Sequence, residues 1–147
     1  MVLGLVSALA LAAGTALAQG AVSDPTLAAA AKEAGAVTTA SGLVYRATQE
    51  GTGPNPAARD TVRVHYRGTF ADGREFDSSF KRGQPIEFPL SGVIPCWTEG
   101  VQRMKVGGKA RLTCPSAIAY GARGAPPVIP PNTTLIFEVE LLGIRPR

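Results

Sequence analysis

Apolar and polar residues alternate with a period of two along much of this chain, and this alternation restricts its fold more than any other feature. It is clearest over residues 61–70, where Val62, Val64 and Tyr66 alternate with polar or charged neighbours. Successive side chains of a strand point to opposite faces, so such a segment predicts a strand that buries one face. Further strands are predicted at residues 43–47, 75–79, 86–90, 110–114 and 133–142. We therefore expect an antiparallel sheet with one buried face.

One segment has a helical period instead. Trp97, Val101 and Met104 fall at i, i+4 and i+7, which places them on one face of a short helix, and Gly107-Gly108 is expected to end it. Asp72-Gly73, between two extended segments, predicts a two-residue hairpin turn. Residues 115–132 hold five prolines and are predicted to form one long loop, which in a small domain is usually functional. The expected class is α+β, a sheet packed on one helix.

Composition sets the size and excludes some functions. A chain of 147 residues with 45% hydrophobic and 18% charged residues suits a single folded domain and argues against wholesale disorder. The formal charge is only +4, and lysine and arginine are scattered without a cluster of interleaved aromatic residues. We therefore expect no nucleic-acid binding.

The first residues differ in composition from the rest. From Met1 to Ala18 there is no charged residue, and this apolar run closes in Ala-Leu-Ala. The pattern predicts a signal peptide over residues 1–18, cleaved near Ala18, and an exported protein. Small and polar residues interrupt the run, so a stable membrane anchor is not expected. The Ala-rich residues 19–40 are interpreted as a short tether, too short for a dimerisation arm, with a brief helix starting at Asp24-Pro25; the domain is assigned to residues 41–147.

Two cysteines, Cys96 and Cys114, are the only ones in the chain. In an oxidising compartment a disulfide between them is the first interpretation, and closing a loop of roughly 18 residues would stabilise the fold by about 3 kcal/mol. Two buried thiols are the second interpretation. Redox catalysis by Cys96 at the start of the helix is the third, although no C-x-x-C spacing supports it.

Groups for bond-making chemistry are few. The single histidine, His65, falls on the polar face of its strand and is interpreted as an exposed strand residue. No His, Cys, Asp and Glu residues stand at the spacing of a metal site, no serine or cysteine is paired with a histidine in a known nucleophile motif, and the glycines do not form a phosphate-binding loop. No metal and no cofactor are therefore expected, and the many aromatic and apolar side chains favour a binding pocket.

Several ungapped motifs resemble the FKBP-type peptidyl-prolyl cis-trans isomerases. They are Val64-His65-Tyr66-Arg67-Gly68, residues 72–79, residues 93–100, Ala119-Tyr120-Gly121 and residues 129–137. The resemblance covers residues 41–147 and is most similar to bacterial periplasmic members related to the macrophage infectivity potentiator group. It implies an antiparallel sheet of five to six strands wrapped around one short helix, preceded here by the signal peptide, with a pocket between helix and sheet.

The same resemblance assigns the pocket residues. Those expected to act in catalysis are Tyr66, Phe76, Asp77, Trp97, Tyr120 and Phe137. Those expected to bind substrate are Arg82, Ile86, Phe88, Val93, Ile94, Val128 and Ile129. Trp97 would form the floor, Tyr120 would donate a hydrogen bond to a substrate carbonyl, and Arg82 would pair with Asp77.

Three positions depart from the family pattern. Ile86 stands where an aromatic residue is common, Ala125 replaces a frequent histidine of the long loop, and Cys96 replaces the usual glycine before Trp97. The first two changes bear on substrate preference and affinity.

The resemblance implies a peptidyl-prolyl isomerase that speeds the folding of exported, periplasmic proteins without covalent chemistry. Its partners would be proline-containing peptides, unfolded exported proteins and the macrolide inhibitors of the family, and a monomer is expected. The alternative is a chaperone module that binds proline peptides with little turnover. Because one pocket serves both activities, the sequence leaves both open.

Overall fold

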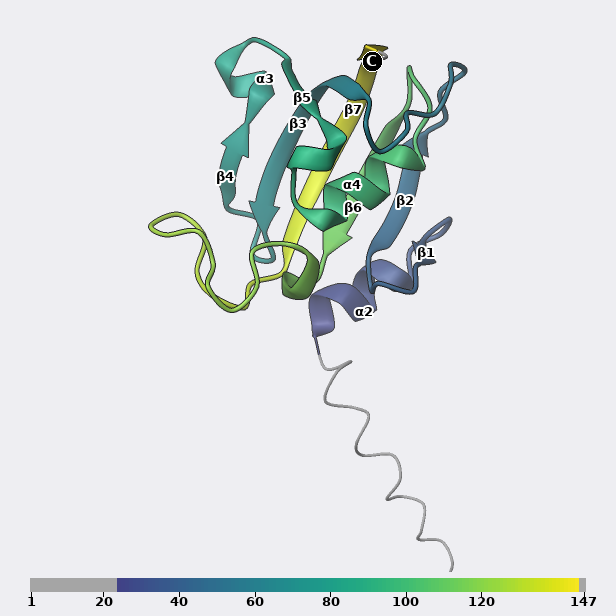
Figure 1. Ribbon diagram of the computed structural model, residues 1–147. Coiled ribbons are helices and arrows are strands. Elements are labelled where there is room, and N and C mark those ends of the chain that lie inside the picture. The colour runs from purple at the N-terminus through teal and green to yellow at the C-terminus, as the bar shows by residue number, and fades with distance from the viewer. Residues whose placement is uncertain (1–23, 146–147) are drawn as a thin grey trace, which may run out of the picture.

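The computed structural model describes residues 24–145, which form one antiparallel sheet of seven strands with short helices on both of its faces (Figure 1). The strands are β1 (Val37–Thr38), β2 (Val44–Gln49), β3 (Thr61–Phe70), β4 (Glu75–Ser78), β5 (Ile86–Pro89), β6 (Lys109–Cys114) and β7 (Leu135–Arg145). Their order is β1-β2-β6-β7-β3-β4. On the same edge of β3, β5 pairs with residues 61–64 and β4 pairs with residues 67–69. The helices are α2 (Pro25–Ala31), α3 (Ser79–Arg82) and α4 (Pro95–Gln102), with 3₁₀ turns η2 (Leu90–Gly92) and η3 (Ser116–Ile118).

The two longest strands, β3 and β7, pair along their whole length at the centre of the sheet. On β3, Val62, Val64 and Tyr66 are buried as the alternation predicts, and Leu135, Phe137, Val139 and Leu141 do the same on β7. The α+β class, with an antiparallel sheet packed on a short helix, is confirmed. The strand beyond the six predicted from the sequence is β1, a two-residue piece at the edge of the sheet.

Helix α4 lies across the buried face of the sheet (Figure 1). Trp97 and Val101 point into the core, and Met104, just beyond the helix, is 2% exposed. The helix ends at Gln102, before the Gly107-Gly108 stop predicted from the sequence. Gly107 instead has φ +94° and donates its N–H to the carbonyl of Leu141 at 2.9 Å. The glycines therefore connect the chain to β6 and do not cap the helix.

The β3–β4 hairpin also differs from the predicted two-residue turn. The Phe70 N–H donates to the Arg74 carbonyl at 2.9 Å, which leaves Ala71, Asp72 and Gly73 in the loop. Gly73 adopts φ +92°, and the Gly73 N–H donates to the Phe70 carbonyl at 2.9 Å. This combination is that of a three-residue hairpin, in which a turn is followed by a left-handed residue.

Part of the segment interpreted as a tether packs on the sheet. Helix α2 begins after Asp24, whose carboxylate accepts the Thr26 N–H at 2.8 Å, and it contacts β2 and β6. Glu33 then lies 3.8 Å from the Arg46 guanidinium and 3.7 Å from that of Arg111. Arg46 and Arg111 are opposite one another in register and point to the face away from α4. Residues 25–38 are thus part of the folded unit, while the predicted signal peptide lies outside the described residues.

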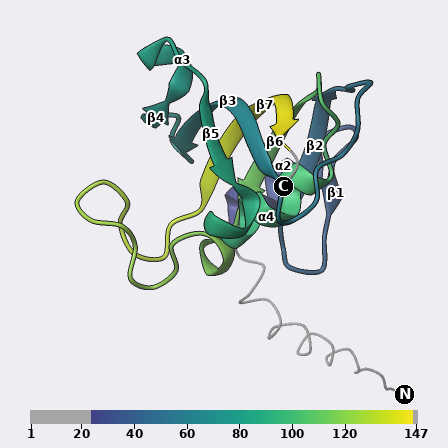
Figure 2. The ribbon, with the colours of Figure 1, turned by 45° about the horizontal axis from the view of Figure 1, so that its top comes forward.

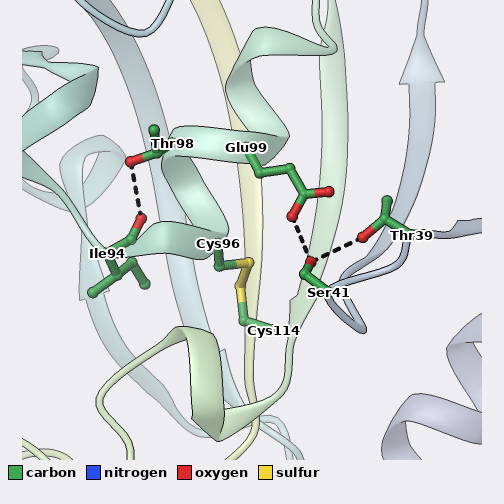
Figure 3. Close-up of a disulfide and its surroundings, with 7 residues drawn as sticks. All are labelled: Thr39, Ser41, Ile94, Cys96, Thr98, Glu99 and Cys114. Atoms are coloured by element: carbon green, nitrogen blue, oxygen red, sulfur yellow. Dashed lines mark hydrogen bonds between the residues drawn. A yellow bond between two sulfur atoms is a disulfide. The ribbon is translucent and has the colours of Figure 1, made fainter.

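A disulfide joins Cys96 in the first turn of α4 to Cys114 at the end of β6 (Figure 3). Both cysteines are fully buried, and their Cα atoms are 5.9 Å apart. The first interpretation of the cysteines is therefore confirmed, and the interpretation as two buried thiols is wrong. The bond fastens the helix that carries Trp97 to the sheet.

Replacing both cysteines by alanine is expected to lower the free energy of unfolding by about 3 kcal/mol, because the unfolded chain loses the constraint of an 18-residue loop. Urea unfolding followed by circular dichroism measures the change. When the wild-type protein is unfolded in reductant, its free energy of unfolding should approach that of the variant. An unfolding midpoint that neither treatment moves would contradict the prediction.

Candidate functional site

A cavity of about 490 Å³ opens between α4 and the sheet. Its lining is mostly aromatic and aliphatic and consists of Tyr66, Phe76, Asp77, Ile86, Phe88, Gly92, Val93, Ile94, Trp97, Tyr120 and Phe137. All six residues that the resemblance assigns to catalysis line it, and so do Ile86, Phe88, Val93 and Ile94 of the substrate-binding set. The fold therefore brings together side chains from β3, β4, β5, α4, β7 and the β6–β7 loop.

The floor of the cavity is the indole of Trp97, which is 5% exposed. Its ring meets three aromatic rings edge to face, with centroid distances of 5.3 Å to Tyr66, 5.3 Å to Phe88 and 5.4 Å to Phe137. Edge-to-face pairs at such distances are favourable beyond the area they bury. Because Trp97 lies one residue after the disulfide-bonded Cys96, the floor is fixed to both α4 and β6.

The wall on the β4 side is Phe76, whose ring lies 5.7 Å from that of Phe137 and 5.0 Å from that of Phe70. These rings can close over β3 because Gly68 has no side chain. A Cβ atom built on Gly68 would lie 2.6 Å from Cζ of Phe76 and 3.0 Å from Cε1 of Phe137. The glycine, which the sequence analysis did not single out, thus determines where both rings stand.

A polar cluster of Tyr66, Asp77 and Arg82 lies at one side of the cavity. The Tyr66 hydroxyl donates to Oδ2 of Asp77, and Nη1 of Arg82 donates to Oδ1 of Asp77 at 2.5 Å. A second guanidinium nitrogen, Nη2, lies 3.4 Å from the Tyr66 hydroxyl. Helix α3 brings Arg82 into place: the Ser78 hydroxyl caps its start, and Gly83, at φ +78°, ends it. The expected pairing of Arg82 with Asp77 is therefore present, although Arg82 itself does not line the cavity.

These contacts move the pKa values of both acids. Burial acts to raise the pKa of Asp77, but the hydrogen bonds from Tyr66 and Arg82 and the charge of Arg82 outweigh it, so the pKa lies below its ordinary value of 3.8. Burial, followed by the hydrogen bond to Asp77, raises the pKa of the Tyr66 hydroxyl. At neutral pH the cluster therefore holds a carboxylate that accepts hydrogen bonds from a neutral phenol and a guanidinium.

Replacing Tyr66 by phenylalanine removes one of these donors and is expected to raise the pKa of Asp77. A lowered carboxyl pKa stabilises the fold above the pKa of the unfolded chain, and this contribution is lost as pH falls through the folded pKa. The free energy of unfolding of the variant should therefore be lower than that of the wild type at neutral pH. It should also decrease less than that of the wild type when the pH is lowered. Carbon NMR titration of the carboxyl measures the pKa directly. Tyr45→Phe, which removes a hydroxyl 3.5 Å from the Arg103 carbonyl, is the control; an equal shift of Asp77 in it would contradict the assignment.

His65 does not stand free as an exposed strand residue. It is half-buried, its ring stacks on Phe80 at 4.6 Å, and its Nδ1 lies 2.8 Å from the Ser79 hydroxyl. Ser79 is fully buried, and its oxygen accepts the Tyr66 N–H at 2.7 Å. Ser79 stands within the motif of residues 72–79 but was not assigned to the site, because only the fold brings it beside a strand 13 residues earlier. Ser79 thus fixes the backbone from which the Tyr66 side chain enters the cavity.

Three residues of the predicted substrate-binding set do not line the cavity: Arg82, described above, and Val128 and Ile129 of the β6–β7 loop. Val128 is 52% exposed, near the tip of the β6–β7 loop, which projects away from the sheet (Figure 2). Ile129 is 5% exposed, and its backbone pairs with Ala125, because the loop folds back and carries this side chain into the core. Tyr120, from the same loop, does line the cavity and is 39% exposed. Gly92, which was not predicted, lines the cavity without a side chain that could have signalled it.

The arrangement is suited to holding an apolar group against aromatic rings, with a phenol and backbone groups at the edge. Within residues 24–145 no three His, Cys, Asp or Glu side chains gather as metal ligands would. No helix in that range is long and apolar enough to cross a membrane.

The family model described as FKBP-type peptidyl-prolyl cis-trans isomerase matches residues 53–142. The chain is 53% identical over 116 residues to the FKBP-type peptidyl-prolyl cis-trans isomerase FkpA of Escherichia coli strain K12, covering 79% of this chain and 43% of the relative. It is 55% identical over 118 residues to the protein of the same name from Aeromonas hydrophila, covering 80% and 44%. The chain thus spans less than half the length of these curated relatives.

Solved structures of peptidyl-prolyl cis-trans isomerases also superpose on this chain. The crystal structure of FkpA from Escherichia coli superposes with a TM-score of 0.82 at 47% identity, covering 90% of this chain and 62% of that one. A peptidyl-prolyl cis-trans isomerase from Pseudomonas syringae pv. tomato superposes with a TM-score of 0.77 at 40% identity, covering 82% and 89%.

Proposed function

Because this chain belongs to the FKBP-type peptidyl-prolyl cis-trans isomerase family, we propose that it accelerates rotation about X-Pro peptide bonds in exported proteins. The observation that supports this most is the cavity floored by Trp97, in which the aromatic and polar residues expected from the family motifs meet. We assign the catalytic role to Tyr66, Phe76, Asp77, Trp97, Tyr120 and Phe137.

The mechanism follows from the chemistry of the amide. Rotation about an X-Pro bond is opposed by a barrier of about 18–20 kcal/mol, because twisting breaks the C–N resonance. The twisted amide is less dipolar than the planar one. A dry aromatic cavity therefore disfavours the planar ground state relative to the twisted state, and each 1.36 kcal/mol of such preference is tenfold in rate.

Polar groups at the cavity edge would hold the peptide turned around its proline. We assign the Tyr120 hydroxyl, which makes no hydrogen bond within the described residues, as donor to a substrate carbonyl. The backbone of Val93 and Ile94 at the start of α4 would pair with the peptide. Asp77 is held by Tyr66 and Arg82, so its carboxylate presents a fixed negative charge beside the rotating amide. No bond to the protein forms in this scheme.

We further propose that the protein acts as a monomer in the periplasm after cleavage of residues 1–18. The charge-free apolar start supports export. The buried disulfide supports an oxidising compartment.

The test is acceleration of cis-trans exchange in a short X-Pro peptide, measured by NMR exchange, beside Asp77→Leu and Tyr120→Phe variants. The wild-type protein should accelerate exchange strongly. Loss of one hydrogen bond, about 0.5–1.5 kcal/mol, should slow Tyr120→Phe by up to about tenfold. A folded, oxidised wild-type protein without acceleration would overturn the proposal.

In that case binding of proline peptides and client chains, without turnover, becomes the leading function. The apolar side chain of Val128, 52% exposed on the β6–β7 loop, supports this second candidate. Suppression of client aggregation would measure it.

The macrolide inhibitors of the family should bind in the same cavity. Trp97 is the only tryptophan, so its fluorescence reports occupancy of the floor directly. Saturating macrolide should change that fluorescence and stop the isomerase. An unchanged spectrum at saturation would count against this cavity as the site.

A further inference from the structure

A second groove adjoins the isomerase cavity. It has a volume of about 610 Å³, and its lining includes Ser41, Ser91, Val93, Pro95, Glu99 and Ile118. Val93 lines both hollows. Residues close together in the sequence are also divided between the two hollows. Gly92 lines the cavity, whereas Ser91 lines the groove. Tyr120 lines the cavity, whereas Ile118 lines the groove. The groove therefore borders the cavity at Val93, next to the start of α4.

Glu99 is the one charged side chain in the lining of this groove. Its Oε1 accepts the Ser41 hydroxyl at 2.5 Å, and the Thr39 hydroxyl lies 2.9 Å from the Ser41 hydroxyl (Figure 3). Within the described residues, Oε2 accepts no hydrogen bond and Glu99 forms no ion pair. The carboxylate is thus held in position by one oxygen, while no cationic side chain among residues 24–145 forms an ion pair with it.

We propose that this groove is an extended substrate subsite, in which Glu99 selects peptides with a basic side chain some residues away from the proline. The inference rests on the proposed isomerase function and names its preferred substrate class. A peptide that leaves the cavity past Val93 enters a hollow whose lining combines apolar Pro95 and Ile118, uncharged polar Ser41, Ser91, Thr98 and Gln102, and the charged Glu99. An extended lysine or arginine fits that combination, because its apolar stem can contact Pro95 and Ile118 while its charged head meets the carboxylate.

The experiment uses the full chain and a neutral X-Pro peptide that is extended, on one side or the other, by a short Gly-Ser spacer carrying one Lys, Gln or Glu. On one of the two sides, kcat/KM for the Lys peptide should exceed that for the Glu peptide by about two- to fivefold, the range of one solvent-exposed ion pair. The ratio should fall toward unity as salt is raised. No Lys preference on either side would overturn the proposal.

Three variants separate charge from structure. Glu99→Gln keeps an acceptor for Ser41 and removes the charge, so the Lys-to-Glu ratio should fall to near unity. Ser41→Ala removes the hydrogen bond and keeps the charge, so the preference for Lys should persist. Glu138→Gln removes an exposed carboxylate on the opposite face of the sheet and should leave the ratio unchanged. A ratio that survives in Glu99→Gln, or that falls equally in Glu138→Gln, would refute the role of Glu99.

Binding distinguishes failure of the subsite from failure of the proposed function. The same peptides are titrated against Trp97 fluorescence, and the ratio of their Kd values is compared between the wild type and Glu99→Gln. If the neutral peptide is bound but not turned over, the isomerase proposal fails, and the Kd ratio alone decides on the subsite. Equal Kd values of the wild-type protein for the Lys and Glu peptides would overturn the proposed subsite.

Discussion

Replacing Trp97 by alanine is expected to lower the free energy of unfolding by about 3–5 kcal/mol and to abolish isomerase activity. The side chain is 5% exposed and packs against the rings of Tyr66, Phe88 and Phe137, so its removal leaves a cavity that these rings cannot fill. Such a loss is a large share of the about 5–15 kcal/mol that stabilises a typical domain. Urea unfolding followed by circular dichroism gives the stability, and NMR exchange of an X-Pro peptide gives the activity.

Trp97→Phe and Phe80→Ala complete this test. The phenylalanine keeps an apolar ring at the floor, so it should fold more stably than the alanine variant and retain part of the activity. Phe80 is 51% exposed and lies outside the cavity, so its truncation should cost less than about 1 kcal/mol and leave the activity intact. If Phe80→Ala were as damaging as Trp97→Ala, the effect could not be ascribed to the cavity floor.

Replacing Gly68 by alanine is expected to reduce isomerase activity at least tenfold while costing about 1–3 kcal/mol of stability. A Cβ atom there would lie 2.6 Å from Cζ of Phe76 and 3.0 Å from Cε1 of Phe137, so both rings must shift. Phe76 and Phe137 line the cavity, and the shift narrows or distorts the space for the proline ring. The activity assay and macrolide-induced change in Trp97 fluorescence should both show weakened binding.

Gly143→Ala is the matched control for this substitution. Gly143 also lies in a strand of the sheet, β7, but a Cβ atom built on it meets nothing within 4 Å. Its replacement should leave kcat/KM close to that of the wild type. Equal loss of activity in the two alanine variants would show that a general effect on the strands is responsible, and would contradict the steric argument for Gly68.

The parts of the fold that the sequence could predict are those in which local pattern and burial agree. The bounds of β3 match the predicted residues 61–70, because alternation over ten residues leaves one register that buries Val62, Val64 and Tyr66. The helix around Trp97 was likewise visible from its spacing. Its end was not, because Gly107 bonds to Leu141 on a strand far along the chain, and no local signal encodes that contact.

The N-terminal segment and the candidate site show the same limit. The Ala-rich residues before Ser41 have little pattern of their own, and the contacts of Glu33 with Arg46 and Arg111 hold them only once β2 and β6 are paired. In the site, Trp97 and Phe137 would be read as core residues by burial alone, so their roles came from the family motifs. Gly68 and Ser79 also stand in these motifs, but they were not assigned to the site, since their importance lies in the residues that contact them in the fold.

Strand β7 is the last strand in the order of the chain, yet it lies between β3 and β6 in the middle of the sheet. Neither half of the sheet can join the other until residues 135–145 have arrived. Until that strand is in place, the two halves of the sheet stay apart and the aromatic residues between them stay uncovered. The Cys96–Cys114 bond links two segments that precede β7, so it can form during that interval and shorten the search that the final strand completes.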